Sequence, residues 1–145
     1  MKNLSILIAE DDADDRFLMQ KAIDEVGYKD VQIRFVENGV EVLADLNNIK
    51  SLKAKNAYPK FILLDLNMPK MDGREVLKNL KTDEEFRKIP VIIFSTTKNQ
   101  LEVKRCYDLG ANTYIVKPVN FDSLVETIQH IRTYWLETAT LADVV

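Results

Sequence analysis

The sequence has little cysteine, histidine and net charge, and it lacks long hydrophobic runs. With Cys106 as its one cysteine, the chain cannot form an internal disulfide framework, which fits a reducing compartment. The formal charge of −3 gives no electrostatic signature of binding to nucleic acid or to an anionic membrane. No apolar run approaches the roughly 20 residues of a membrane-spanning helix, and residues 4–9 are too short for a signal-peptide core. We therefore expect a cytoplasmic protein that contacts neither nucleic acid nor membrane.

The residues that are present predict alternating strands and helices. The chain has 145 residues, 46% of them apolar and 30% charged, which is typical of one globular domain. Short segments rich in branched or aromatic residues predict five strands, at residues 4–9, 32–37, 61–64, 91–94 and 113–117. Between them, and after the last, apolar residues recur at helical spacing. Such alternation predicts an α/β fold in which helices cover both faces of a parallel sheet.

Chemically active side chains follow four of these strands. The acidic run EDDADD (residues 10–15) follows the first strand and Asp65 the third, while STT (residues 95–97) and Lys117 end the fourth and fifth. Taken singly, each has a structural explanation, such as a helix cap, a turn or a solvated loop. In an open parallel sheet, however, ligands bind beyond the carboxyl ends of the strands. Several carboxylates gathered there repel one another unless a hard cation such as Mg²⁺ sits among them. The combination therefore favours a functional site.

The same residues resemble a known family. The segments EDD, DLNMPKMDG (residues 65–73), FST and YIVKP (residues 114–118) resemble the receiver domains of two-component response regulators, in the same order along almost the whole chain. The resemblance implies a single flavodoxin-like, doubly wound (βα)5 domain with strand order 2-1-3-4-5. It also implies one receiver domain across residues 1–145 without an output domain, ending in a C-terminal extension (residues 134–145).

Site residues carry over from the resemblance position by position. Asp65 matches the phosphoryl acceptor, and Glu10 and Asp11 match the acidic pair that holds Mg²⁺ together with Asp65 and the backbone carbonyl of Asn67. Mn²⁺ could replace Mg²⁺ in such a site. The protein would then be a signalling phospho-acceptor that catalyses only its own phosphorylation and dephosphorylation.

The resemblance assigns further residues to phosphoryl binding and switching. Lys117 and Ser95 match the lysine and hydroxyl that contact the phosphoryl group, and the backbone N–H of Thr96 would help to cradle it. Tyr114 matches an aromatic that rotates when Ser95 moves, although an edge tyrosine with its hydroxyl in water is the simpler explanation from sequence alone. The family pattern also implies a cis peptide bond between Lys117 and Pro118.

Partners and assembly follow from a narrower resemblance. The segments NNIKSLKAKNAYP (residues 47–59), NLKTDEEFRKIPVIIFST (residues 79–96) and YWLETATL (residues 134–141) are similar to single-domain regulators associated with bacterial phytochromes. We therefore expect a sensor histidine kinase, of the phytochrome type, as the partner. The apolar residues after Ile131 favour a homodimer through the fifth helix and the extension; the alternative is that this segment folds back on its own domain.

Two other functional classes are alternatives to a receiver domain. A phosphatase of the haloacid-dehalogenase type also forms an aspartyl phosphate, but it carries a second aspartate two residues after the nucleophile, where this chain has Asn67. A purely structural interaction module would be distinguished by an Asp65 that cannot be phosphorylated. His130 lies on the predicted fifth helix without a cluster of other ligands, so no metal-binding or phosphorelay role is assigned to it.

Overall fold

The five strands form one parallel sheet in the order β2-β1-β3-β4-β5, as predicted. The computed structural model describes residues 4–144. Its strands are β1 (Leu4–Ala9), β2 (Val31–Val36), β3 (Ile62–Leu64), β4 (Val91–Ser95) and β5 (Thr113–Val116). The third strand is one residue shorter than expected, but Phe61 is still completely buried beside it. This strand order places the carboxyl end of β1 directly beside that of β3, with β4 next.

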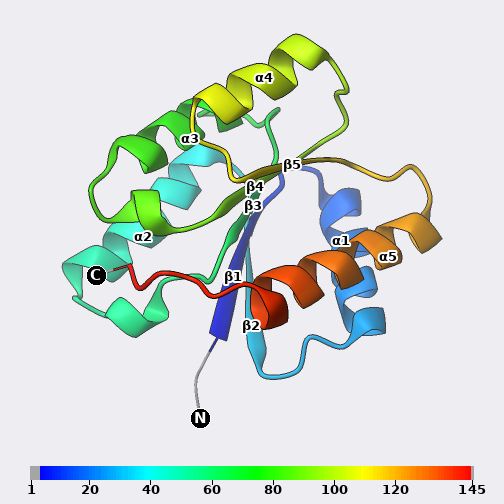
Figure 1. Ribbon diagram of the computed structural model, residues 1–145, viewed down its shortest axis with the longest axis horizontal. Helices are drawn as coiled ribbons and strands as arrows, with labels where there is room; N and C mark the ends of the chain where they lie inside the picture. The colour runs from blue at the N-terminus through cyan, green and yellow to red at the C-terminus, as the bar shows by residue number, and fades with distance from the viewer. Residues whose placement is uncertain (1–3, 145) are drawn as a thin grey trace.

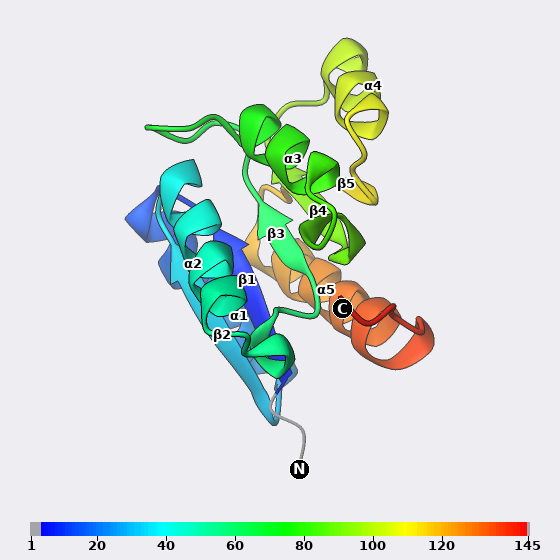
Figure 2. The same cartoon turned by 90° about the vertical axis from the view of Figure 1, so that its left-hand side faces the viewer.

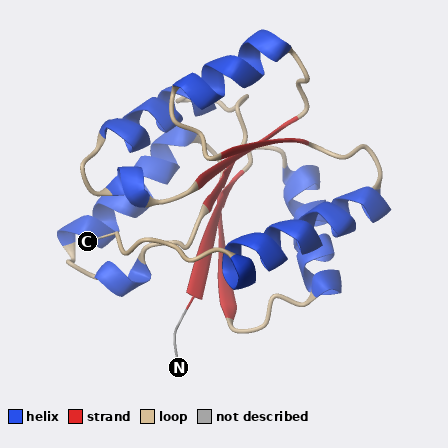
Figure 3. Cartoon of the chain, in the orientation of Figure 1, coloured by secondary structure: helices blue, strands red, loops and turns tan. Residues whose placement is uncertain are grey.

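Helices cover both faces of the sheet (Figures 1 and 3). They are α1 (Ala13–Val26), α2 (Gly39–Ser51), α3 (Gly73–Thr82), α4 (Gln100–Asp108) and α5 (Phe121–Arg132). The views in Figures 1 and 2 show α1 and α5 together on one face and α2, α3 and α4 on the other. Short 3-10 turns at Lys55–Ala57 and Phe86–Lys88 precede β3 and β4, and a π-helical turn at Thr133–Thr138 follows α5.

Local sequence explains where these helices begin and end. Each begins after an aspartate or asparagine whose side chain accepts a hydrogen bond from a backbone N–H of the first turn, namely Asp12, Asn38, Asp72, Asn99 and Asn120. Gly27 ends α1 with φ of 81°, and Gly110 follows α4 with φ of 106°. Both glycines thus take the left-handed conformation that disfavours any residue with a Cβ.

The apolar core has two layers because the sheet is buried on both faces. Alternate residues of β1 serve opposite layers: Leu7 and Ala9 pack with the buried residues of α2 and α3, while Ile6 and Ile8 pack with those of α1 and α5. Strands buried on both faces need continuous rather than alternating apolar residues. That requirement explains the uninterrupted apolar runs at residues 6–9 of β1, 62–64 of β3 and 91–94 of β4.

The C-terminal segment folds back on its own domain and bridges the two core layers. The Trp135 ring lies 6.4 Å from that of Phe61, between ring centroids, and packs on the α1/α5 layer. Val144 packs on the opposite layer. In Figure 1 the chain between them runs in red from the end of α5 across the molecule, and residues 141–144 line the same pocket as residues 53–60, which precede β3. The structure thus shows the fold-back that the sequence left as the alternative to a dimer contact.

Candidate functional site

Asp65 lies at the carboxyl edge of the sheet, immediately after β3. Its backbone N–H donates a hydrogen bond to the carbonyl of Ala9 at 3.1 Å, which ties the end of β3 to the end of β1. The following loop returns against it, and a Cβ on Gly73 would lie only 2.3 Å from the Asp65 carbonyl oxygen. Glycine at position 73 therefore allows α3 to begin in direct contact with the Asp65 backbone. The end of β1 and the start of α3 therefore fix the position of the Asp65 backbone, which carries the carboxylate.

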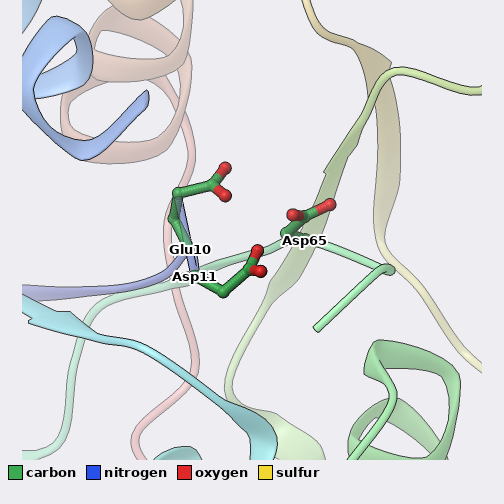
Figure 4. Close-up of side chains that lie close together, drawn as sticks. All are labelled: Glu10, Asp11 and Asp65. Carbon is green, nitrogen blue, oxygen red and sulfur yellow. The ribbon is translucent and has the colours of Figure 1, made fainter. Parts of the chain in front are cut away.

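Glu10, Asp11 and Asp65 form an acidic cluster (Figure 4). One carboxylate oxygen from each lies within 4.8 Å of the others, so a single ion could contact all three. Glu10 and Asp65 are buried and Asp11 is exposed, so the cluster opens to solvent on one side. Asn67 lies beside it, with its backbone N–H 3.4 Å from Asp65 Oδ1. An open set of carboxylate oxygens fits a hard divalent cation that retains part of its water shell.

Lys117 supplies the positive charge of the site from the end of β5. Its ammonium group donates a hydrogen bond to Glu10 and lies 3.6 Å from Asp65 Oδ2. Its backbone N–H donates to the carbonyl of Ser95 at 2.8 Å, which fixes the lysine against β4. Asp15, in the first turn of α1, also lies 3.6 Å from the ammonium group. The sequence pattern gave no indication of this contact between Asp15 and Lys117.

Burial and crowding shift the pKa values of the clustered groups. Burial raises the pKa of Glu10 from 4.5 to about 7; the hydrogen bond from Lys117 lowers it, and the charge of Asp65 raises it. Burial also raises the pKa of Asp65, against the attraction of Lys117. Burial lowers the pKa of Lys117, but its bond to Glu10 and the charge of Asp65 outweigh this, so the net shift is upward. The site thus carries more negative charge than one lysine neutralises, and a divalent cation fits that excess.

The hydroxyl side of the site lies at the end of β4. Ser95 is fully buried, and its Oγ accepts a hydrogen bond from the Thr97 backbone N–H at 3.4 Å. Thr96 is exposed. The Tyr114 hydroxyl donates to the Thr97 carbonyl at 2.9 Å, so this ring turns toward the β4–α4 loop instead of placing its hydroxyl in water. Ser95 and Tyr114 therefore contact the same loop residue.

The expected cis bond at Lys117–Pro118 is wrong for this structure, because residues 4–144 contain no cis peptide bond. Lys117 reaches Ser95, Glu10 and Asp65 with a trans bond to its proline. Trans is also the more stable form of such a bond by about 0.5–1 kcal/mol.

An acidic cluster and a lysine at the carboxyl edge of a 2-1-3-4-5 sheet define a receiver-type site. Residues 6–129 match the response regulator receiver domain, and the chain belongs to this family. It is 35% identical over 136 residues to response regulator Rcp1 of Synechocystis sp., covering 94% of this chain and 91% of Rcp1.

Solved structures give the same result. The phosphorylated cyanobacterial phytochrome response regulator RcpA superposes with a TM-score of 0.85 at 37% identity, covering 96% of this chain and 98% of RcpA. The Mn²⁺-bound form of response regulator Rcp1 gives a TM-score of 0.84 at 34% identity, covering 96% of this chain and 99% of the other.

Family membership confirms several predictions. The protein is a response regulator, a signalling protein homologous to a phytochrome-associated regulator, and a receiver domain implies a sensor histidine kinase as its partner. The acidic cluster fits a divalent metal. Within residues 4–144, no helix is both long and apolar enough to cross a membrane. The family match identifies a receiver domain rather than a phosphatase.

Proposed function

We propose that Asp65 accepts a phosphoryl group from a partner histidine kinase in a Mg²⁺-dependent reaction. The observation that carries this proposal is the position of the Asp65 carboxylate, which is buried beside Glu10 and Asp11 and lies 3.6 Å from the Lys117 ammonium group. Among the described residues, this is where a nucleophilic carboxylate, a set of metal-binding oxygens and a fixed cation meet.

The residues of the site divide the chemistry of transfer between them. An Asp65 oxygen attacks phosphorus, the bond between phosphorus and the donor atom breaks, and the bonding electrons leave with the donor. Lys117 compensates the charge of the transferred group, and the Ser95 hydroxyl and the Thr96 backbone N–H donate hydrogen bonds to its oxygens. Water then cleaves the acyl phosphate, and the protein returns to its resting form without acting on any other substrate.

The metal ion would be held by Asp11, Asp65 and the backbone carbonyl of Asn67. Glu10 belongs to the same cluster of carboxylates. Bound Mg²⁺ neutralises charge on the phosphoryl oxygens and orients them for in-line transfer. Mn²⁺ can take the same oxygen ligands. Support for a divalent site comes from the Mn²⁺-bound form of the homologous Rcp1 and from the three carboxylate oxygens here, which all lie within 4.8 Å of one another.

Ser95 and Tyr114 would form the conformational switch. Both contact Thr97, through its N–H and its carbonyl respectively. A phosphoryl group on Asp65 would draw the Ser95 hydroxyl toward it, which changes the space available to the tyrosine ring. The equilibrium between two positions of the β4–α4 loop and α4 would then shift with phosphorylation.

We also propose a phytochrome-type kinase as the partner, because the regulators similar to this chain include a phytochrome response regulator. With a single cysteine and hence no internal disulfide, the chain fits a reducing compartment, so we place this encounter in the cytoplasm. The chain would act as one receiver domain across residues 1–145, and its C-terminal extension (residues 134–145) with α5 would form a homodimer contact. Tyr134 supports the dimer, since 53% of this aromatic residue stays exposed next to the folded-back segment.

Labelling with a small phosphodonor tests the proposal. Incubation with acetyl phosphate and Mg²⁺, followed by mapping of the modified residue by mass spectrometry, should place the phosphoryl group on Asp65. Asp65→Asn should abolish the label while circular dichroism shows an unchanged fold. Asp14→Asn is the matched control and should label normally, since Asp14 is not among the clustered carboxylates. Full labelling of the Asp65 variant would refute the assignment.

Metal binding gives an independent test. By calorimetry, alanine at Asp11 or Asp65 should weaken Mg²⁺ binding strongly, because each supplies an oxygen of the cluster. Alanine at Asp14 should leave the affinity unchanged. Alanine at Asp15 should change it only slightly, through the loss of the ion pair with Lys117. Equal losses at all four positions would contradict the proposed ligand set.

A further inference from the structure

Arg74 joins α3 to α4 through a forked ion pair. Its Nε lies 2.9 Å and 2.6 Å from the two carboxylate oxygens of Glu102, and its Nη2 also pairs with that carboxylate. Its Nη1 donates to both oxygens of Asp72, at 2.9 Å and 3.0 Å. The Arg74 and Glu102 side chains are only 18% and 23% exposed, so solvent screens this pair less than an ordinary surface ion pair.

One end of this pair is directly connected to the phosphoacceptor. Arg74 follows Gly73, whose Cα lies so close to the Asp65 carbonyl that a Cβ would clash at 2.3 Å. Gly73 also donates its backbone N–H to the carbonyl of Leu66 at 2.9 Å. The start of α3 is therefore packed on the backbone of the acceptor residue, and a displacement of Asp65 would be transmitted to Arg74 through backbone contacts.

Glu102, at the other end of the ion pair, belongs to α4, which buries few apolar side chains. Cys106 is the buried side chain of α4, whereas Leu101 is 78% exposed and Tyr107 48% exposed. Glu102 lies in the first turn of this helix, three residues after its capping residue Asn99. With so little apolar burial, a partly buried bidentate ion pair is a substantial part of what fixes the position of the α4 N-terminus.

The same end of α4 is attached to the proposed switch. The N–H of Asn99 lies 3.3 Å from the Thr97 Oγ1, and Thr97 in turn contacts Ser95 and Tyr114. Two routes thus connect the start of α4 to the site. One runs through Thr97 to Ser95 and Tyr114, and the other runs through Arg74 to the start of α3.

We propose that Arg74 is a positioning residue that couples Asp65 to α4 through its ion pair with Glu102. The inference rests on the proposed function and extends it, because it assigns transmission to a second route that does not pass through Ser95 or Tyr114. The planar guanidinium fork is essential to this role: a lysine would keep the charge but lose the paired geometry. Side-chain hydrogen bonding to Arg74 lowers the pKa of Glu102, which keeps the pair ionised at neutral pH.

The test measures how α4 responds when the acceptor is occupied. Mg²⁺ and beryllofluoride, a stand-in for the phosphoryl group on Asp65, are added to the full chain, and the backbone amide signals of residues 100–108 are followed by NMR. Arg74→Met and Glu102→Gln should each reduce the shift of the α4 equilibrium about fivefold, at the lower end of typical coupling between sites. Arg74→Lys should retain only part of the response, and the double variant should lose no more than either single one.

Two controls separate this coupling from general effects. Glu75→Gln removes an exposed charge next to Arg74, and Arg105→Met removes an exposed charge from α4 that is close to Glu102. Both should respond as wild type does. Unfolding by urea, recorded for every variant, shows whether a lost response merely reflects lost stability.

The outcomes also distinguish failure of the coupling from failure of the proposed function. If beryllofluoride does not bind to the wild type and acetyl phosphate leaves Asp65 unlabelled, the proposed function fails. If the wild type binds and α4 responds, but the Arg74→Met and Glu102→Gln variants respond equally well, only the coupling is overturned. Normal labelling of Asp65 in these variants with a reduced α4 response would support the assignment of Arg74.

Discussion

Lys117 and Glu10 form an ion pair across the carboxyl edge of the sheet, joining the end of β5 to the end of β1. The Glu10 carboxylate also accepts the backbone N–H of Asp12 at 3.2 Å, so it is fixed from both sides. Because the side chains of Lys117 and Glu10 are only 12% and 2% exposed, this pair lies in a largely desolvated pocket. Removing Lys117 would leave the buried Glu10 carboxylate without its counter-charge, whereas Lys117 without Glu10 would keep Asp65 and Asp15 at 3.6 Å.

Lys117→Ala should therefore destabilise the protein and uncouple the switch. The free energy of unfolding should fall by about 3 kcal/mol in urea titrations without metal, as expected when a buried ion pair loses one partner. Saturating Mg²⁺ should recover part of that loss, because the cation neutralises the same carboxylates. We expect Mg²⁺ still to bind, while beryllofluoride no longer shifts the Tyr114 signals. A wild-type conformational response would show that Lys117 does not couple the site to β5.

Glu10 should give the stability an unusual pH dependence. Its pKa is raised from 4.5 to about 7, so between these values the folded protein holds a proton that the unfolded chain has released. The contribution of Glu10 to folding therefore decreases as pH rises through this window, by about 3 kcal/mol at most. In metal-free urea titrations, the free energy of unfolding of the wild type should fall relative to that of Glu10→Gln as the pH rises from 4.5 to 7.5.

The same shift predicts how metal binding responds to pH. A divalent cation binds the ionised carboxylate, so its binding should release protons near neutral pH, and the apparent affinity should rise as pH passes through 7. In Glu10→Gln this rise should be smaller. Calorimetry in buffers with different ionisation enthalpies measures the released protons directly. Identical proton release in wild type and variant would contradict the assignment to Glu10.

Gly73→Ala should be more destabilising than Gly27→Ala. The new Cβ at position 73 would lie 2.3 Å from the Asp65 carbonyl oxygen and 2.7 Å from the Leu66 Cα, and backbone atoms cannot rotate away. We expect a loss of about 2 kcal/mol or more, with weaker Mg²⁺ binding because Asp65 is displaced. Position 27 has open space around it but a φ of 81°, so alanine there should cost about 1 kcal/mol and leave metal binding intact.

The C-terminal segment should contribute to both stability and association. A chain ending at Thr133 loses the contact of Trp135 with Phe61 and the packing of Val144, so its free energy of unfolding should fall by about 3 kcal/mol. Under the dimer proposal, light scattering at about 50 µM, a concentration suited to weak regulatory affinities, should show a dimer for the full chain and a monomer for the shortened one.

Tyr134→Ser provides the matched control for this experiment. Because Tyr134 is 53% exposed on its own domain, the variant should remain nearly as stable as the wild type while losing association. A full chain that is monomeric with and without phosphodonor would contradict the dimer, and the extension would then act only as a strap on its own domain.

The sequence by itself determined the order of elements and the location of the site. Strand order aside, these depend on local properties: apolar periodicity, capping residues such as Asp72 and Asn99, and glycines such as Gly27 that tolerate positive φ. Asp65 could be placed at the sheet edge because a parallel β/α alternation sends the carboxyl ends of all strands to one side. The strand order came from family resemblance, which the structure and the comparisons bear out.

Only the tertiary structure decided which side chains meet. Three contacts join residues from different parts of the fold: Asp15 with Lys117, the Tyr114 hydroxyl with the Thr97 carbonyl, and Arg74 with Glu102. Their formation depends on rotamers, on helix rotation and on the separation of neighbouring elements, none of which a local pattern encodes. The fold-back of the C-terminal segment has the same origin: an apolar tail must bury its side chains, but whether it covers its own core or a partner depends on which surface lies within reach.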